Sequence, residues 1–418
     1  MYSYKIEGGH RLCGQTYVSG SKNASLPILA GAILNDGITK LYNLPQIEDV
    51  RITLEILKVL GCKIKREKDK VTIDSRNVSK TKIPDELMRK LRSSVIIAGA
   101  LLSRLKKVEF SYPGGCDIGA RPIDLHLKNF RRIGIKITEN SRYIDCKCDR
   151  IKSSEINFDF PSVGATENVI LASVLGNHEV IINNAAIEPE IDDLIKFLNK
   201  MGANISGIGT NKIKIIGVEK LKEVTYRIMP DRIEAGTFLV ATAITNGNVR
   251  IKDINISHLT SVINKLEEMG VRCIKGNDYI DVSSNKRLEC TDINTLPYPG
   301  FPTDMQPIIS VLLMCSKGMS IITENIFENR FKYALELKRM GAKLIIKDRN
   351  LIITGIRRYH ASSVDATDLR GGAAMVLAGL NARGKTRVNN IKYILRGYDA
   401  LDKKLNALGA NIELKEGE

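Results

Sequence analysis

Apolar residues recur at helical spacing six times along the chain, and each recurrence ends at a glycine. These glycines lie 68 to 73 residues apart, at Gly61, Gly134, Gly202, Gly270, Gly341 and Gly409. The positions one and four before each glycine are apolar, as Leu198 and Met201 are before Gly202. An apolar stripe closed by a glycine is typical of an amphipathic surface helix. Self-similarity at a fixed period predicts that one structural unit is repeated six times.

A second, wholly apolar stretch precedes each amphipathic helix, for example residues 95–102, 168–176, 238–245 and 307–314. A helix that is apolar all round is buried, so these stretches are predicted to form the core. After each glycine, runs such as residues 342–355 place two strand-like segments around a polar turn. Each unit is therefore predicted to be a buried helix, a strand, a surface helix and a strand pair.

Three units per domain divide the chain near Pro230. The first domain is predicted to span residues 22–229, and the second to comprise residues 1–21 and 230–418. The last unit ends at ELKEGE and lacks its final strand. We expect the segment YSYKIEG, residues 2–8, to supply that strand and so to bring the two ends of the chain together.

Composition supports a globular protein with two cores, since 43% of the 418 residues are hydrophobic. No apolar run reaches about 18 residues without a charge, and MYSYKIEGGHR does not resemble a signal peptide. We therefore expect a soluble cytoplasmic protein. The eight cysteines are scattered, and only Cys146 and Cys148 lie close together. This pattern favours reduced thiols over a metal site.

The net charge of +16 is compatible with nucleic acid binding, with a solvated basic surface or with small anionic substrates. Aromatic residues make up only 5% of the chain, tryptophan is absent, and the basic residues are dispersed. These features disfavour nucleic acid as the partner. Anionic small molecules would require only a few of the 63 lysines and arginines.

Polar residues gather where the six buried helices are predicted to begin. The segments are 21–25, 92–94, 161–167, 230–236, 302–306 and 367–372. Ser94 and Thr166 are explained as helix caps. Caps do not explain Lys22, Arg92 and Arg370, because cations are unfavourable at the positive end of a helix. A bound phosphate or carboxylate would resolve this conflict. Parallel buried helices would bring these segments to one active-site cleft between the domains.

Cys116 follows the glycine pair of YPGGC and precedes Arg121 by five residues. Glycines make a loop easy to bend, and a nearby cation lowers the pKa of a thiol. Cys116 is therefore the candidate reactive thiol. A merely buried cysteine is the better interpretation of Cys62 or Cys315.

Several motifs together resemble the UDP-N-acetylglucosamine 1-carboxyvinyltransferase family over essentially the whole chain. They include GSKNASLPILAGAIL, PGGCDIGARPIDLHL, SVGATE, MPDRIEAGTF, PGFPTDMQ, ENIFENRF, ATDLRGG and ILRGYDALDKKLNALGANI. The resemblance implies a two-domain inside-out α/β barrel, with three βαβαββ units in each domain. It implies transfer of the enolpyruvyl group of phosphoenolpyruvate to the 3′-hydroxyl of UDP-N-acetylglucosamine, with release of phosphate. That reaction is the first committed step of peptidoglycan synthesis, and it requires no metal or organic cofactor.

The resemblance also assigns roles by position. The catalytic set is Cys116, Asp304, Lys22 and Arg396. Cys116 would act as an acid or add to phosphoenolpyruvate, it would be alkylated by fosfomycin, and Asp304 would be the base. The phosphate of phosphoenolpyruvate would contact Lys22, Arg121 and Arg396, with Arg92 and Arg370 completing the anion site. The sugar would contact Asn23, Asp304 and Ile326. The uridine pocket would comprise Arg121, Pro122, Ile123, Asp124 and Leu125, with Ser162, Val163 and Gly164 near the diphosphate.

Two aspartates have less definite roles. Both are counted among the substrate-binding residues. Asp368 is expected to pair with Lys22 and orient it, and Asp231 is expected to be partly a helix cap, with a direct catalytic part left open. Two positions depart from the family pattern: Phe160 replaces a common lysine, and Leu395 replaces a common aspartate before Arg396. Two alternatives remain, a sister transferase with another acceptor and a non-catalytic basic paralogue. Segment 121–125 and the retained catalytic set argue against them.

Overall fold

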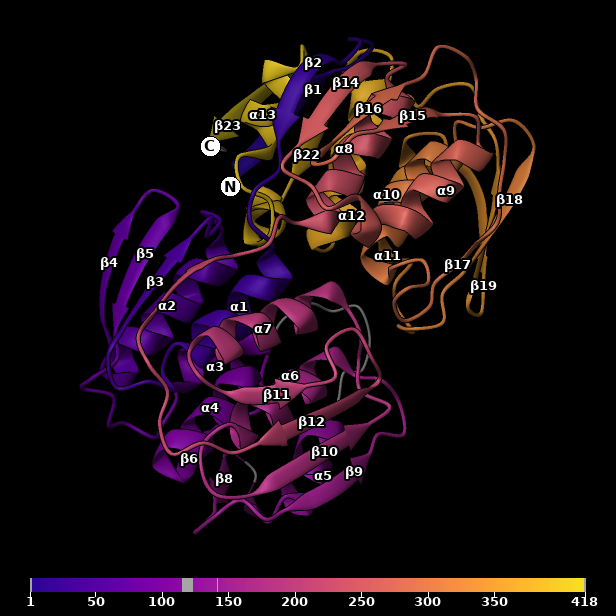
Figure 1. Cartoon of the computed structure of the whole chain (residues 1–418). Coiled ribbons are helices and arrows are strands. Elements are labelled where there is room, and N and C mark those ends of the chain that lie inside the picture. Colours follow the sequence, from indigo (N-terminus) through magenta and orange to yellow (C-terminus); the bar gives the residue numbers. More distant parts are fainter. Residues whose placement is uncertain (1, 115–122, 141, 417–418) are drawn as a thin grey trace. The chain divides into compact units, whose positions relative to one another are not determined.

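The computed structural model describes residues 2–114, 123–140 and 142–416, and these form two compact units. Residues 20–114 and 123–229 form the first, here called the contiguous unit (Figure 1). Residues 2–19 and 230–416 form the other, here called the composite unit. Each unit encloses its own cluster of buried apolar side chains.

The contiguous unit has three buried helices, α1 (Lys22–Gly31), α4 (Ile96–Leu105) and α6 (Val163–Ser173). Its surface helices are α2 (Glu48–Leu60), α5 (Asp124–Arg132) and α7 (Pro189–Lys200), and the short α3 (Asp85–Lys90) and η1 (Arg92–Val95) precede α4. One sheet has the order β13 (Val224–Arg227), β3 (Ile38–Tyr42), β5 (Lys70–Asp74), β4 (Lys63–Glu67). The second is β6 (Lys107–Phe110), β8 (Ile144–Lys147), β7 (Lys136–Glu139). The third is β11 (Asn204–Ser206), β12 (Lys212–Ile216), β10 (Glu179–Asn183), β9 (Ser154–Asn157).

The composite unit repeats this plan with buried helices α8 (Arg232–Ile244), α10 (Gln306–Leu313) and α12 (Leu369–Asn381). Its surface helices are α9 (Thr260–Glu268), α11 (Lys332–Arg339) and α13 (Leu401–Ala407), with short helices η2 (Ile256–Leu259), η3 (Thr303–Met305) and η4 (Ile391–Arg396). One sheet is β15 (Arg272–Lys275), β16 (Tyr279–Ser283), β14 (Asn248–Lys252), β2 (Cys13–Tyr17). The second is β17 (Ile293–Asn294), β18 (Met319–Thr323), β20 (Asn350–Thr354), β19 (Lys343–Lys347). The third is β21 (Ser363–Asp365), β22 (Lys385–Asn389), β1 (Tyr2–Glu7), β23 (Asn411–Glu416).

The six predicted repeats are confirmed by these sheets. In each four-stranded sheet, one edge strand pairs in parallel and the other pairs are antiparallel, as β9, β10 and β12 show. The sheet of β6 is completed by a single parallel bridge between Lys82 and Glu109. All six helix-ending glycines have positive φ, from 88° at Gly341 to 117° at Gly61. Glycine adopts this conformation without the strain that a Cβ would cause.

The N-terminal strand completes the last repeat, as predicted. Tyr4 of β1 faces Val388 of β22 on one side and Leu414 of β23 on the other, both antiparallel (Figure 1). Tyr4 and Ile6 are 2% and 0% exposed, so the strand belongs to the core of the composite unit. In the part of the chain that the structure describes, no helix is long and apolar enough to cross a membrane.

Candidate functional site

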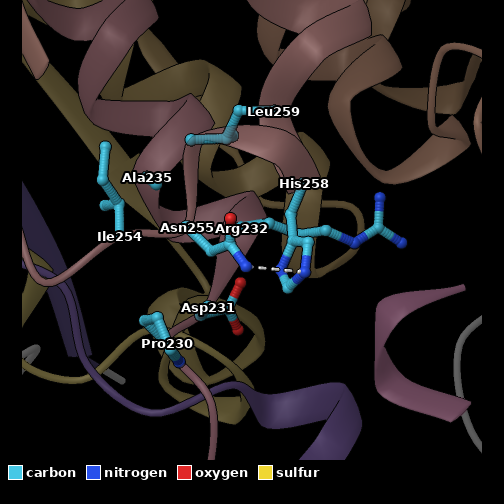
Figure 2. Close-up of a pocket in the computed structure, with 8 residues that line it drawn as sticks. All are labelled: Pro230, Asp231, Arg232, Ala235, Ile254, Asn255, His258 and Leu259. Atoms are coloured by element: carbon cyan, nitrogen blue, oxygen red, sulfur yellow. Dashed lines mark hydrogen bonds between the residues drawn. The ribbon is translucent and has the colours of Figure 1, made fainter. Parts of the chain in front are cut away.

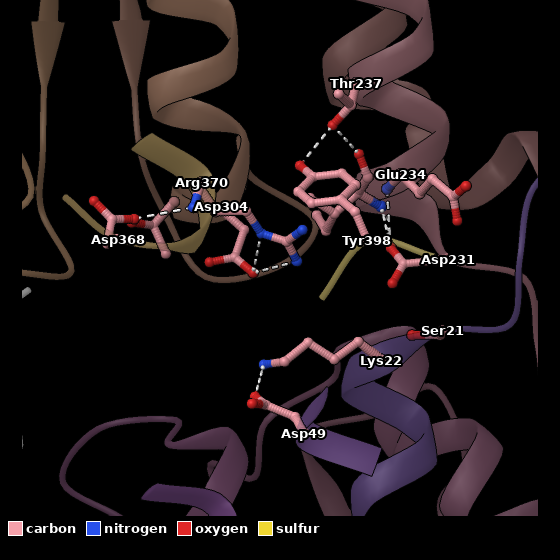
Figure 3. A network of polar contacts seen from close by, with 12 residues as sticks. Ser21, Lys22, Asp49, Asp231, Glu234, Thr237, Asp304, Asp368, Arg370 and Tyr398 are labelled. Carbon is pink, nitrogen blue, oxygen red and sulfur yellow. Dashed lines mark hydrogen bonds and ion pairs between the residues drawn. The ribbon is translucent and has the colours of Figure 1, made fainter. Parts of the chain in front are cut away.

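Asp304 lies in η3, directly before α10, and contacts two arginines, of which Figure 3 shows Arg370. Its Oδ1 accepts a hydrogen bond of 3.1 Å from Arg330 Nη2. Its Oδ2 accepts from Arg370, at 3.1 Å from Nη2 and 3.3 Å from Nε. Both arginine side chains are 2% exposed, whereas that of Asp304 is 27% exposed. Ion pairing is therefore the role that the geometry gives this carboxylate, which is partly exposed.

In this cluster the guanidinium groups of Arg330 and Arg370 both face the carboxylate of Asp304. Arg370 Nη1 and Arg330 Nε are buried and have no hydrogen-bond partner within the described ranges. Arg370 also lies 5.1 Å from the ring centroid of Tyr398, whose hydroxyl is 2.9 Å from that of Thr237 on α8. Burial acts to lower the pKa of Arg370, but Tyr398, Asp304 and Asp231 raise it above the usual value. The guanidinium therefore stays charged and suited to an anion.

Asp231 and Asp368 both cap buried helices. Asp231 Oδ1 accepts from the backbone N–H groups of Ile233 and Glu234 at 2.8 and 3.0 Å. Asp368 Oδ1 accepts from the N–H groups of Arg370 and Gly371 at 3.0 and 3.1 Å. Asp231 is thus a helix cap, and its direct part in binding or catalysis stays a prediction. The pairing of Asp368 with Lys22 stays a prediction.

In the contiguous unit, Lys22 begins α1 and its Nζ lies 3.3 Å from Asp49 Oδ2 on α2 (Figure 3). The Asp49 side chain is 1% exposed and that of Lys22 is 16% exposed. The cations at helix starts predict a bound anion. The structure shows that protein carboxylates already offset two of these cations, Asp49 for Lys22 and Asp304 for Arg370.

Glu167 on α6 adds a second carboxyl group near Lys22. Burial raises its pKa well above the usual range, and Glu190 and Glu188 raise it further, while Lys22 opposes the shift. These shifts favour the neutral form of Glu167 more than in a solvent-exposed glutamate. Asp49 is the carboxylate that the structure pairs with Lys22.

His126 joins two of the predicted substrate segments. Asn168 donates from its amide nitrogen to Val95 O at 3.0 Å and to His126 Nδ1 at 2.9 Å, while its Oδ1 accepts from Gly99 N. The two backbone contacts fix the amide, so Nδ1 must accept and Nε2 carries the proton. Burial lowers the pKa of His126 to about 4, with Arg92 contributing. The ring is thus a neutral donor, and a Cβ at Gly164 would lie 3.2 Å from its Cε1.

The structure places the remaining predicted residues as follows. Asp124 and Leu125 open α5 beside His126, and Ser162 caps α6 just before Val163 and Gly164. Arg92, Asn23, Ile326 and Arg396 are half-buried. Ile123 is 4% exposed and belongs to the apolar core, so only its backbone remains for a ligand. Phe160 and Leu395, the two departures, are 42% and 40% exposed. Cys116, Arg121 and Pro122 lie outside the described residues.

A shallow surface pocket lies beside Asp231 (Figure 2). Its polar wall includes Asn255, whose Nδ2 is 3.0 Å from His258 Nε2. The pocket shares only Asp231 with the predicted site. Among the described residues, no three His, Cys, Asp or Glu side chains gather as metal ligands would.

Sequence reasoning missed three residues that contact candidate groups within their own units: Asp49 and His126 in the contiguous unit, and Arg330 in the composite unit. His126 stands in the quoted motif PGGCDIGARPIDLHL and is one of only five histidines, so a signal was present. Arg330 likewise stands in ENIFENRF. Asp49 carries no such signal, because an acidic residue in the first turn of a surface helix is routine.

Comparison with known proteins supplies the family. The model described as EPSP synthase (3-phosphoshikimate 1-carboxyvinyltransferase) matches residues 6–405. A UDP-N-acetylglucosamine 1-carboxyvinyltransferase 2 of Caldanaerobacter subterraneus subsp. tengcongensis is 50% identical over 413 residues, 99% of each chain. A protein of Geobacter metallireducens named UDP-N-acetylglucosamine 1-carboxyvinyltransferase is 43% identical over 408 residues, 98% of each chain.

Solved structures agree on the fold. The enolpyruvyl transferase NikO from Streptomyces tendae superposes with a TM-score of 0.91 at 25% identity, covering 100% of this chain and 99% of that one. An EPSP synthase from Acinetobacter baumannii gives 0.78 at 19% identity over the whole of both chains. The predicted fold class is confirmed by these superpositions. By sequence and by fold, the chain belongs to the UDP-N-acetylglucosamine 1-carboxyvinyltransferase family.

Proposed function

We propose that this protein transfers the enolpyruvyl group of phosphoenolpyruvate to the 3′-hydroxyl of UDP-N-acetylglucosamine and releases phosphate. The observation that supports it most is the full-length identity of 43 to 50% with relatives that carry this activity in their names. The proposal also places the protein in the cytoplasm and makes its reaction a step of peptidoglycan synthesis. Cell-wall growth and cell division would depend on that step.

The chemistry of the composite unit suits this reaction. The sugar hydroxyl becomes a good nucleophile only as its proton leaves, which requires a carboxylate within hydrogen-bond reach. Asp304 is the candidate base, because its carboxylate is partly exposed and is held by Arg330 and Arg370. Its two arginines would also stabilise negative charge on phosphoenolpyruvate, since guanidinium groups bind phosphate and carboxylate well.

The contiguous unit carries the groups proposed for the nucleotide. Ser162 at the start of α6 and the neutral His126 beside Gly164 offer hydrogen-bond donors. The start of a buried helix also favours the negative charge of a diphosphate. Cys116, Arg121 and Arg396 complete the proposed catalytic and anion-binding set.

The test is phosphate release from phosphoenolpyruvate by the purified chain. We expect release with UDP-N-acetylglucosamine and none with either substrate alone. Shikimate 3-phosphate is the matched acceptor control, because the matching family model bears the name of the enzyme that uses it. Release with shikimate 3-phosphate and none with the UDP-sugar would overturn the proposal in favour of the sister activity.

A further inference from the structure

Glu324 is a buried carboxylate at the end of β18, and it is 1% exposed. Its Oε1 accepts hydrogen bonds from the backbone N–H groups of Ile326 and Phe327 at 2.8 and 3.1 Å. The same oxygen accepts from the hydroxyl of Thr295 at 2.9 Å. Its Oε2 accepts from the hydroxyl of Thr303 at 3.0 Å. Four donors from three segments of the composite unit thus converge on one side chain.

Two of these segments carry residues of the candidate site. Thr303 is the immediate neighbour of Asp304, and Ile326 is the residue expected to flank the sugar. Arg330, at the far end of the same loop, joins the two segments a second time. Its Nη2 donates to Thr303 O at 3.3 Å and to Asp304 Oδ1 at 3.1 Å. Loop 324–330 and the start of α10 are therefore connected at both ends of the loop.

The chemistry of these contacts requires a carboxylate rather than any polar side chain. Taking a carboxylate out of water is unfavourable unless it is hydrogen-bonded, and four donors meet that requirement here. A glutamine would keep only one oxygen acceptor and would turn an amide N–H₂ group toward other donors. Alanine would leave two backbone N–H groups and two hydroxyls without this acceptor.

We propose that Glu324 is a positioning residue that holds Asp304 and Ile326 in their working geometry. It acts through the Thr303 hydroxyl on one side and through the Ile326 and Phe327 amides on the other. The inference rests on the proposed function for the roles of Asp304 and Ile326. It adds that turnover and UDP-sugar affinity both depend on a carboxylate that touches neither substrate.

Thr303→Val is the sharpest variant, because it removes one hydroxyl and keeps the shape of the side chain. We expect kcat to fall about 10-fold, since small misplacement of a catalytic group has effects of this size or larger. Thr323→Val is the matched control: it removes a hydroxyl from the residue beside Glu324, but that hydroxyl donates to Asn350 Oδ1 at 2.7 Å and not to Glu324. The control should retain kcat. Equal kcat values for the two variants would overturn the proposal.

Glu324→Ala removes the contact with Thr303 and the contacts with the amides of Ile326 and Phe327 together. We expect a lower kcat together with a KM for UDP-N-acetylglucosamine that rises about 10-fold, because the loop that carries Ile326 loses its anchor. Glu324→Gln should fall between Glu324→Ala and the wild type. A lower melting temperature with unchanged kinetic constants would show that Glu324 is merely structural and would overturn the proposal.

Hydrogen exchange separates this inference from the proposed function, because it needs no activity. The amides of Ile326 and Phe327 should exchange faster in Glu324→Ala, while those of the buried helices α8 and α12 keep their protection. Amides of residues 303–306 should exchange faster in Thr303→Val than in Thr323→Val. If the wild type failed to release phosphate, the proposed function would fall and these rates would still decide the positioning role. Unchanged exchange at both segments would overturn it.

Discussion

At the scale of single residues, substitution of Asp304 should have the largest effect. Its carboxylate is the ion-pair partner of two buried arginines and the proposed base of the reaction. Asp304→Asn keeps the shape but removes the charge. We expect turnover to fall roughly 10²–10⁴-fold, the range for loss of a general base. Stability should fall as well, since Arg330 and Arg370 would be left buried without their counter-charge.

Steady-state kinetics well below the melting temperature of Asp304→Asn would separate these two effects. The variant should be folded by circular dichroism and slow in turnover, with binding of the UDP-sugar weakened far less. Near-normal turnover would show that the base lies elsewhere, with Asp231 the next candidate.

His126 should make stability depend on pH in acid. Burial lowers its pKa to about 4 in the folded chain, whereas the unfolded value is near 6.5. The unfolded state therefore takes up a proton first as pH falls, so stability is lost from about pH 6.5 down to about pH 4. The loss should be on the order of 3 kcal/mol. Urea unfolding of the wild type and His126→Asn should diverge at pH 7.5 and converge at pH 4.5. A constant difference across this range would contradict the assignment.

Asp49 should support the use of phosphoenolpyruvate through Lys22. Asp49→Asn removes the charge that lies 3.3 Å from Lys22 Nζ. We expect kcat/KM for phosphoenolpyruvate to fall about 10-fold, equivalent to about 1.4 kcal/mol. Glu48→Gln is the control, since Glu48 lies in the same helical turn but pairs with the exposed Arg51. In a Lys22→Gln background the Asp49 substitution should have little further effect. Additive losses in the double variant would mean that Asp49 acts independently of Lys22.

At the scale of elements, the caps of the buried helices are where structure and site meet. Asp368→Ala removes two hydrogen bonds from the start of α12 and should lower the free energy of unfolding by about 1 kcal/mol. Asp368→Asn should recover most of that loss, because asparagine also caps helices well. Denaturant titration of the two variants gives the comparison. Loss of turnover in Asp368→Asn at nearly normal stability would reveal a second role for this aspartate in the reaction.

Elements were predictable because their signals are local. The stripe before Gly202 fixes a surface helix, and the run at residues 307–314 fixes a buried one. Side-chain partners were not predictable, because they join distant positions. Arg370 meets Asp304 across 66 residues, and Thr303 meets Glu324 across 21. Neither separation in sequence follows from a helical or strand period. The resemblance therefore assigned these residues to a site but did not reveal the hydrogen bonds and ion pairs that position them.

At the scale of the whole molecule, the two units should differ in their ability to fold alone. Residues 20–229 contain every strand of their three sheets, whereas the composite unit takes β1 and β2 from residues 2–19. We expect fragment 20–229 to unfold cooperatively in urea. Fragment 230–418 should not, because two of its three sheets would each lack a strand. Adding residues 1–19 through a linker should restore a cooperative transition. A cooperative transition in fragment 230–418 alone would contradict the conclusion that this unit needs residues 1–19 to fold.

The position of β1 between β22 and β23 has a consequence for the order of events during synthesis. Tyr4 leaves the ribosome 384 residues before its partner Val388 and 410 residues before its partner Leu414. Translation at roughly 5–20 residues per second makes that interval about 20 to 80 seconds. The contiguous unit can close its core within this interval, while β1 waits in front of it without its sheet partners. Completion of the composite unit is therefore timed by the synthesis of β22 and β23, and until then the side chains of Tyr4 and Ile6 lack the core that buries them.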